Sequence, residues 1–224
     1  HETSCLIATL PKAAAVGLLL RFLSIAGGQN HAVAQVFGAM AVVSMFIGNL
    51  CALGQQDVKR LLAYSGVAHA GYLLIGMLAL NRTGISAAIY YTAGYVAMTA
   101  ACFFVIYRLT PGGENITVDG LRGLHRRSPL LAATLAIAAM GLAGIPPTVG
   151  FTGKFFMFAG ALERGSYLLV LSGILNICIG AFYYLRLVRA AYTTESGDAG
   201  PVEMPLQARI CAVALIAAIL GAGM

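Results

Sequence analysis

Long apolar segments alternate with short polar links along the whole chain. Each apolar segment has about 20 residues or more, the length that a helix needs to cross the hydrocarbon core of a bilayer. The longest link, Thr110 to Arg127, is expected to hold a short interfacial helix near Leu121–His125. The pattern predicts an all-α polytopic bundle of about seven transmembrane spans, forming one domain over 1–224, with spans at 3–26, 32–54, 58–80, 84–109, 128–163, 166–192 and 206–224.

The fifth apolar segment is too long for one straight crossing, because it contains about 36 residues at 1.5 Å each. Pro146 and Pro147 explain this length, since two successive prolines remove two backbone donors and clash with the preceding helical turn. The sequence therefore predicts two half-helices, roughly 128–144 and 148–163. Such a break is tolerated inside a membrane only where protein or water satisfies the backbone, and transporters place breaks of this kind at ion sites.

Composition agrees with a membrane protein. Hydrophobic residues make up 59% of the 224 residues, charged residues 10%, and the mean hydropathy is +0.85. A soluble domain usually carries about 25% charged residues. With so few charged residues, the formal charge of +6 is better explained by basic residues in the loops than by a charged surface.

The basic residues lie in the links, mostly on one side of the predicted bundle. If the spans alternate in direction, the side where the first span begins carries Lys59, Arg60, Arg108, Arg122, Arg126, Arg127, Arg186, Arg189 and Arg209. The other side carries Arg21, Arg82 and Arg164. The positive-inside rule then predicts that the N-terminal end is cytoplasmic. This placement explains the net charge better than a nucleic-acid partner does.

Two of the three lysines stand inside apolar segments. Lys12 follows Pro11 in the first segment, and Lys154 follows the two prolines of the fifth. An ammonium group at the bilayer centre costs about 2.5–3.5 kcal/mol on insertion scales, so such residues usually have a function. For Lys12, the alternative is a side chain that reaches the interface from a shorter helix starting near Pro11. Lys154 is too far from either end of its segment for that.

A histidine stands in the middle of the third segment. Ser65, His69 and Tyr72 share one helical face, and hydroxyls around an imidazole can relay protons. The alternative is that these groups only hydrogen-bond neighbouring helices and hold the bundle together. In the fourth segment, Tyr91, Tyr95 and Thr99 recur at helical spacing. The simpler interpretation is that they pack against neighbouring helices, and the alternative is that they extend the same polar path.

Motifs for other chemistry are absent from the sequence. The five cysteines include no C-x-x-C pair, and there is no glycine-rich nucleotide loop and no H-E-x-x-H motif. We therefore expect neither a cofactor nor a metal, and no redox active site, in this chain. It opens with His1 and ends at Met224 inside an apolar run, so we expect it to be part of a longer protein.

Two stretches carry family motifs. The first has GNL at 48–50, QQDVKRLLAYS at 55–65 and AHAGYLL at 68–74; the second has LAGIPP at 142–147, GF at 150–151 and GKF at 153–155. Together they resemble the antiporter-like subunits of complex I, and most closely subunit N of bacterial NADH:quinone oxidoreductase. Gly66 departs from the pattern, because serine is usual at that position in the family.

The resemblance implies a fold of fourteen helices with two inverted five-helix repeats, of which this chain would be helices eight to fourteen. Lys12 and Lys154 then match the family's lysines on helices eight and twelve, and His69 matches a polar position on the central axis. The implied partners are the bilayer, protons, water and the other membrane subunits of a complex in the bacterial inner membrane. NADH, FMN, Fe–S clusters and quinone would be bound by other subunits.

The resulting hypothesis is a proton-translocating subunit of a respiratory NADH:quinone oxidoreductase. Lys12, His69 and Lys154 would relay protons, supported by Ser65, Tyr72, Tyr95, Pro11, Pro146 and Pro147. The alternatives are a subunit of a related cation/proton antiporter or membrane-bound hydrogenase, a secondary transporter for a small solute, and a membrane scaffold without conduction.

Overall fold

The computed structural model describes residues 2–26, 31–110, 112–194 and 200–224, and the side chains from residue 11 onward except for those of residues 24, 26 and 31. Helices make up nearly all of this part. They are α1 (Glu2–Ala26), α2 (His31–Leu53), α3 (Val58–Leu78), α4 (Arg82–Leu109), the 3-10 helix η1 (Asp119–Leu121), α5 (Leu124–Arg127), α6 (Pro129–Ala143), α7 (Val149–Glu163), α8 (Tyr167–Tyr192) and α9 (Leu206–Gly221).

The predicted spans are confirmed, with helix ends that differ by at most three residues. The long fifth segment is broken as predicted, into α6 and α7, and its Pro146–Pro147 peptide bond is cis. Among the residues that the structure describes, the four helices α2, α3, α4 and α8 are individually long and apolar enough to cross a membrane. Instead of one interfacial helix near Leu121–His125, the long link holds the two short elements η1 and α5.

Polar side chains set the starts of two central helices. The Asp57 carboxylate accepts a hydrogen bond from the Arg60 amide at 2.9 Å at the start of α3. The Asn81 side chain accepts one from the Gly84 amide at 2.8 Å at the start of α4. Each bond satisfies one of the amide groups that a helix start leaves without an intrahelical partner.

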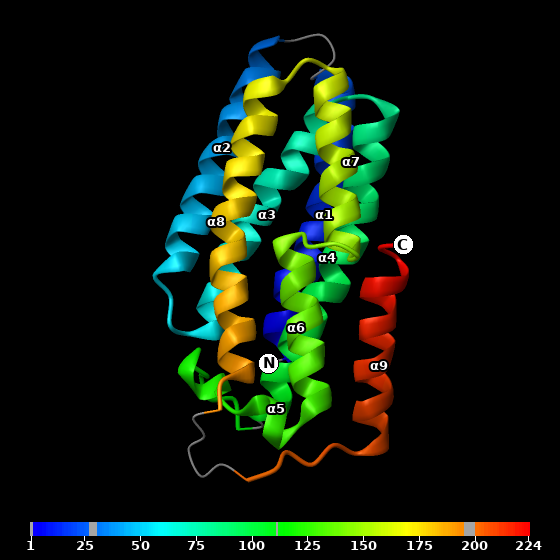
Figure 1. Ribbon diagram of the computed structural model, residues 1–224. Coiled ribbons are helices and arrows are strands. Elements are labelled where there is room, and N and C mark those ends of the chain that lie inside the picture. Colours follow the sequence, from blue (N-terminus) through cyan, green and yellow to red (C-terminus); the bar gives the residue numbers. More distant parts are fainter. Residues whose placement is uncertain (1, 27–30, 111, 195–199) are drawn as a thin grey trace.

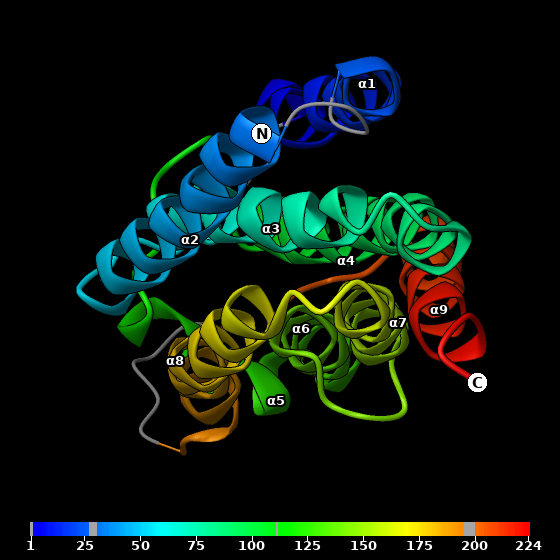
Figure 2. The same ribbon diagram turned by 90° about the horizontal axis from the view of Figure 1, so that it is seen from above.

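The helices form three groups (Figures 1 and 2). In the view from above, α3 and α4 lie side by side in the middle, with α1 on one side and α8, α6 and α7 on the other. Helix α2 packs on both α3 and α8, and α9 packs on α4 and α6. The two middle helices therefore contact nearly every other span, and their facing side chains lie at the centre of the bundle.

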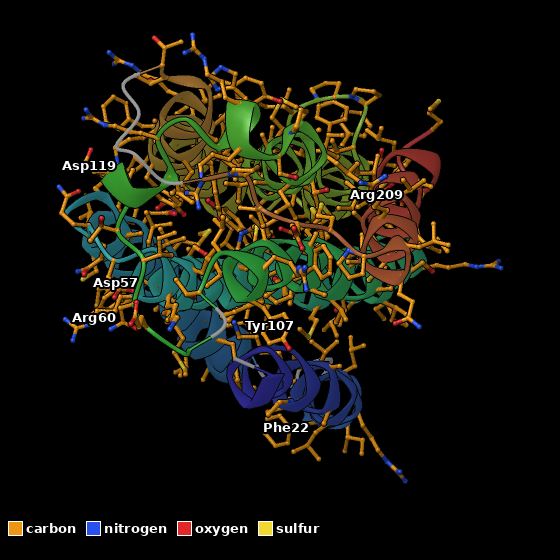
Figure 3. All side chains as sticks on the ribbon, turned by 90° about the horizontal axis from the view of Figure 1, so that it is seen from below. Phe22, Asp57, Arg60, Tyr107, Asp119 and Arg209 are labelled. Atoms are coloured by element: carbon orange, nitrogen blue, oxygen red, sulfur yellow. The ribbon has the colours of Figure 1, made fainter. Side chains whose placement is uncertain are left out.

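The links gather at two ends, as alternating spans require. The links between α2 and α3, after α4 and after α8 lie at the lower end of Figure 1. There Lys59, at the start of α3, donates hydrogen bonds to the carbonyls of Gly113 and Glu114, and Arg108, at the end of α4, donates one to that of Glu203. Figure 3 views this end from below, with Asp57, Arg60 and Asp119 along one margin and Arg209 on the other side, by α9. At the opposite end, the Asn81 amide donates to Glu163 at 2.8 Å.

Glycines let the helix backbones approach closely around the break. A Cβ atom on Gly150, at the start of α7, would overlap the carbonyl oxygen of Gly141 in α6. A Cβ on Gly160 would lie 2.6 Å from the backbone nitrogen of Gly84 in α4. Small residues at crossings are characteristic of membrane helix packing, where backbones must come near each other to gain dispersion contacts.

The contact between the two half-helices predicts a strong effect of one added methyl group. We expect Gly150→Ala to destabilise the protein by about 1–3 kcal/mol, because backbone atoms of Gly141 cannot yield as a flexible side chain would. Gly17→Ala is the matched control, since its Cβ would meet nothing within 4 Å. The measurement is the temperature at which detergent-purified protein loses its monodisperse peak on size-exclusion chromatography. Equal transition temperatures for both variants would contradict the assigned crossing.

Candidate functional site: buried amines, a histidine and tyrosine hydroxyls

Lys154 lies in the second turn of α7 and points into the bundle. Its side chain is only 4% exposed, so the sequence prediction of a lysine buried inside the fifth span is correct in position. The Nζ atom donates hydrogen bonds to the carbonyl oxygens of Leu142 at 2.7 Å and Ala143 at 3.2 Å. Both carbonyls belong to the last turn of α6, so the ammonium joins the two half-helices.

The two prolines explain why these carbonyls accept the lysine. In an unbroken helix, the carbonyls of Leu142 and Ala143 would bond the amides of residues 146 and 147. Pro146 and Pro147 have no N–H group, so these two acceptors are left without their helical donors. Lys154 donates to the same two oxygens.

Gly144 ends α6 and shapes the acceptor end. It has a φ of 87°, in the left-handed region that glycine adopts without steric cost. Its amide bonds the carbonyls of Met140 and Gly141 at 3.0 Å, and the Ile145 amide also bonds Met140 at 3.0 Å. The earlier carbonyls of the turn are thus satisfied by backbone donors. The negative end of the α6 dipole faces the ammonium and stabilises its charge.

A network around Asn49 supports the aromatic ring that covers the ammonium. The Nζ atom of Lys154 lies 4.9 Å from the centre of the Tyr72 ring, within cation–π range. The Tyr72 hydroxyl accepts a hydrogen bond from Asn49 Nδ2 at 3.2 Å, and the same nitrogen donates to Asn176 Oδ1 at 2.9 Å. The Tyr183 hydroxyl donates to Asn49 Oδ1 at 2.9 Å. Asn49 therefore links α2, α3 and α8.

His69 is held between two tyrosines. Its Nδ1 atom lies 2.5 Å from the Tyr91 hydroxyl and its Nε2 atom 2.9 Å from the Tyr184 hydroxyl, and its side chain is 1% exposed. In neutral imidazole one nitrogen donates and the other accepts, so one tyrosine hydroxyl accepts a hydrogen bond from the ring and the other donates one to it. The arrangement connects α4, α3 and α8 through a group that can exchange its donor and acceptor nitrogens.

The two hydroxyls that contact the His69 imidazole belong to α4 and α8, not to α3, the helix that carries His69. Ser65 Oγ donates to the Leu62 carbonyl at 2.8 Å, and the Tyr72 hydroxyl is bonded to Asn49. Ser65 and Tyr72 share the face of His69, as expected, and the rings of Tyr72 and His69 are 5.7 Å apart. Within the described part of the chain, the imidazole nitrogens bond instead to Tyr91 and Tyr184.

Lys12 reaches the same centre from α1. Its half-buried ammonium donates to the Tyr95 hydroxyl at 2.8 Å, and the Tyr95 ring lies 5.1 Å from that of His69. Pro11 lies inside α1, which continues through it from Glu2 to Ala26. The lysine therefore stands on a full-length helix and does not begin a shorter one.

No carboxylate balances the buried amines within the described residues. The one side-chain ion pair in that part of the chain joins Arg122 to Asp119 at 2.8 Å, near the lower end. Lys12 and Lys154 are instead held by a hydroxyl and by carbonyl oxygens. Neutral oxygens allow an amine to gain or lose a proton without leaving an unpaired buried carboxylate behind.

Sequence reasoning missed four polar residues of this site. Asn49 and Asn176 are 1% and 0% exposed, and the paired Tyr183 and Tyr184 are 1% and 2% exposed. The signal was present, since both asparagines stand inside apolar segments, where a polar side chain needs a partner. Their partners were not readable, because they lie up to 134 positions away in the chain.

The chain matches the family described as "NADH:quinone oxidoreductase/Mrp antiporter, TM" over residues 2–180. The chain therefore belongs to this family of transmembrane subunits.

Among curated relatives, NADH-quinone oxidoreductase subunit N 2 of Syntrophobacter fumaroxidans is 45% identical over 226 residues, which cover 100% of this chain and 48% of the relative. The chain spans about half the length of the curated relatives that it matches.

Two solved structures share its fold. A chain of respiratory complex I from Thermus thermophilus with bound NADH aligns with a TM-score of 0.83 and 25% identity, over 93% of this chain and 44% of that one. A chain of the Mrp complex from Dietzia sp. DQ12-45-1b aligns with a TM-score of 0.82 and 21% identity, over 94% and 48%.

The Asn49 network predicts a loss of stability when its centre becomes apolar. We expect Asn49→Leu to destabilise the protein by about 1–2 kcal/mol, because the Tyr183 hydroxyl and the Asn176 amide lose a buried partner. Leu50→Ala is the control, since Leu50 is 56% exposed and makes no polar contact. Thermal transitions in detergent provide the measurement. A larger shift for the control would contradict the role of the network.

Proposed function

We propose that this chain is part of a proton-translocating membrane subunit of a respiratory NADH:quinone oxidoreductase, with Lys12, His69 and Lys154 as its proton relay. The observation that carries the proposal is the 4% exposed Lys154 ammonium on the two carbonyls that the prolines leave free. Such a buried amine is unfavourable in lipid surroundings and is typical of ion pathways. The identity to relatives named as subunit N supports the same function.

The geometry suggests how the groups exchange protons. Tyr95 contacts the Lys12 ammonium, and its ring lies 5.1 Å from that of His69, which is bonded to Tyr91 and Tyr184. Hydroxyls and imidazole both donate and accept, so a proton added at one side can leave from the other after reorientation. Two positive charges in a poorly screened interior repel each other, so protonation of one lysine promotes release from the other.

The remaining parts of the proposal concern the whole protein. The chain would form helices eight to fourteen of the family fold within one transmembrane domain, in the bacterial inner membrane with its N-terminal end in the cytoplasm. The uneven distribution of basic residues between the two ends supports this orientation. Other membrane subunits would be its partners, and NADH, FMN, Fe–S clusters and quinone would bind elsewhere in the complex.

A cation/proton antiporter is the second candidate, because the family and the shared fold include the Mrp complex. The two candidates differ in the ion and in the energy source. Proton transport that requires NADH oxidation and is unchanged by sodium supports the oxidoreductase subunit. Transport that proceeds without NADH and follows a sodium gradient supports the antiporter.

Lys154 should be required for proton transport. We expect Lys154→Ala to lower the ratio of protons moved per NADH oxidised by about tenfold, because removal of a relay group typically costs about 10²–10⁴-fold in its own step while other steps continue. The ratio is measured in inside-out membrane vesicles as acidification against NADH consumption, with the amount of assembled complex determined in the same vesicles.

The third lysine provides the matched control. Lys59 is at the lower end, bonded to Gly113, Glu114 and Asn115, outside the relay. We expect Lys59→Ala to keep the parental ratio. Normal transport in Lys154→Ala at normal assembly would remove Lys154 from the mechanism.

Tyr184 should matter through its hydroxyl. We expect Tyr184→Phe to lower the proton-to-NADH ratio by about twofold or more, because His69 Nε2 loses its partner while the ring volume stays. Tyr167→Phe is the control, since Tyr167 is on the same helix and 69% exposed. The same vesicle assay applies. Equal ratios for the two variants would show that His69 needs no hydroxyl at this nitrogen.

A further inference from the structure

Gly66, on α3, lies directly against the Lys12 ammonium. A Cβ atom built on this glycine would overlap Lys12 Nζ and would lie 3.0 Å from the Tyr95 hydroxyl. The ammonium thus occupies the space that the first side-chain carbon of any other residue would fill.

The same spot is where the first lysine joins the buried hydroxyls. Tyr95 is 2% exposed and bonds Lys12 at 2.8 Å, and its ring lies 5.1 Å from the ring of His69, one turn after Gly66 on α3. Among the described contacts of Lys12, its hydrogen bond and its cation–π contact both involve Tyr95. The position of the Lys12 ammonium next to Gly66 therefore decides whether Lys12 contacts Tyr95 and, through it, the other groups of the relay.

We propose that Gly66 is a positioning residue, which admits the Lys12 ammonium to the Tyr95 hydroxyl and so connects α1 to the polar centre of the bundle. The inference rests on the proposed function and assigns a role to a residue outside the relay itself.

Two substitutions separate volume from polarity. Alanine and serine place the same Cβ against Lys12, so each must displace the flexible end of the lysine. The serine hydroxyl both donates and accepts, and can therefore bridge the displaced ammonium and the Tyr95 hydroxyl. The alanine methyl group cannot. Alanine is also the better helix former by about 1 kcal/mol relative to glycine, so Gly66→Ala should not fail through loss of helix stability.

The experiment compares Gly66→Ala and Gly66→Ser in the complete assembled complex, with the vesicle assay described above. We expect Gly66→Ala to lower the proton-to-NADH ratio by about twofold or more, since a displacement of about 1 Å is enough to slow a transfer step. Gly66→Ser should keep more than half of the parental ratio. Gly17→Ala, on α1 with open space around its Cβ, is the control for a glycine change as such.

A double variant tests whether Gly66 acts through Tyr95. Tyr95→Phe alone should lower the ratio, and adding Gly66→Ala to it should change the ratio little further, because the contact is already lost. Independent, multiplying losses would overturn the inference. Equal losses in Gly66→Ala and Gly66→Ser would support the steric role of the glycine and would rule out a bridge through the serine hydroxyl.

The outcome also separates this inference from the function on which it rests. Loss of transport in Lys154→Ala together with a parental ratio in Gly66→Ala would overturn the role of Gly66 alone. Parental ratios in both Lys154→Ala and Lys12→Ala would overturn the proposed proton relay, and the role of Gly66 with it. The amount of assembled complex is measured separately, and each proton-to-NADH ratio is compared per assembled complex.

Discussion

The contact between the Lys154 ammonium and two carbonyls of α6 is the constraint from which the rest of the centre follows. A charged amine at bilayer depth must be met by fixed dipoles, and a helix interior offers none because its carbonyls are already bonded. Pro146 and Pro147 remove the two amides that would occupy the carbonyls of Leu142 and Ala143. The break in the helix and the buried charge therefore need each other.

This constraint extends to the packing around it. Two half-helices that end inside the bundle must be enclosed by neighbouring spans, and glycines let the backbones come close enough: Gly150 lies against Gly141. The ammonium is covered by the Tyr72 ring, which Asn49 holds from a third helix. Within the described core, carbonyl oxygens, a hydroxyl and an aromatic ring take the place of carboxylates as partners of the two lysines.

The sequence predicted what is local and missed what depends on helix rotation. Span positions and the break at Pro146 follow from hydropathy and from the missing proline amides, so both agree with the structure. The partners of His69 depend on how α4 and α8 turn toward α3, and they are Tyr91 and Tyr184, whereas Ser65 shares the face of His69 and bonds the Leu62 carbonyl. Periodicity places residues on one face of a helix, whereas it does not say which neighbour that face meets.

The two lysines are held by chemically different partners. Carbonyl oxygens only accept, so Lys154 donates to both of its oxygen partners, the carbonyls of Leu142 and Ala143. A tyrosine hydroxyl both donates and accepts, so Tyr95 accepts from Lys12 and keeps a proton of its own to donate elsewhere. The contact at Lys12 therefore belongs to a group that can pass a hydrogen bond onward, as the imidazole of His69 can, whereas the contact at Lys154 ends on backbone acceptors.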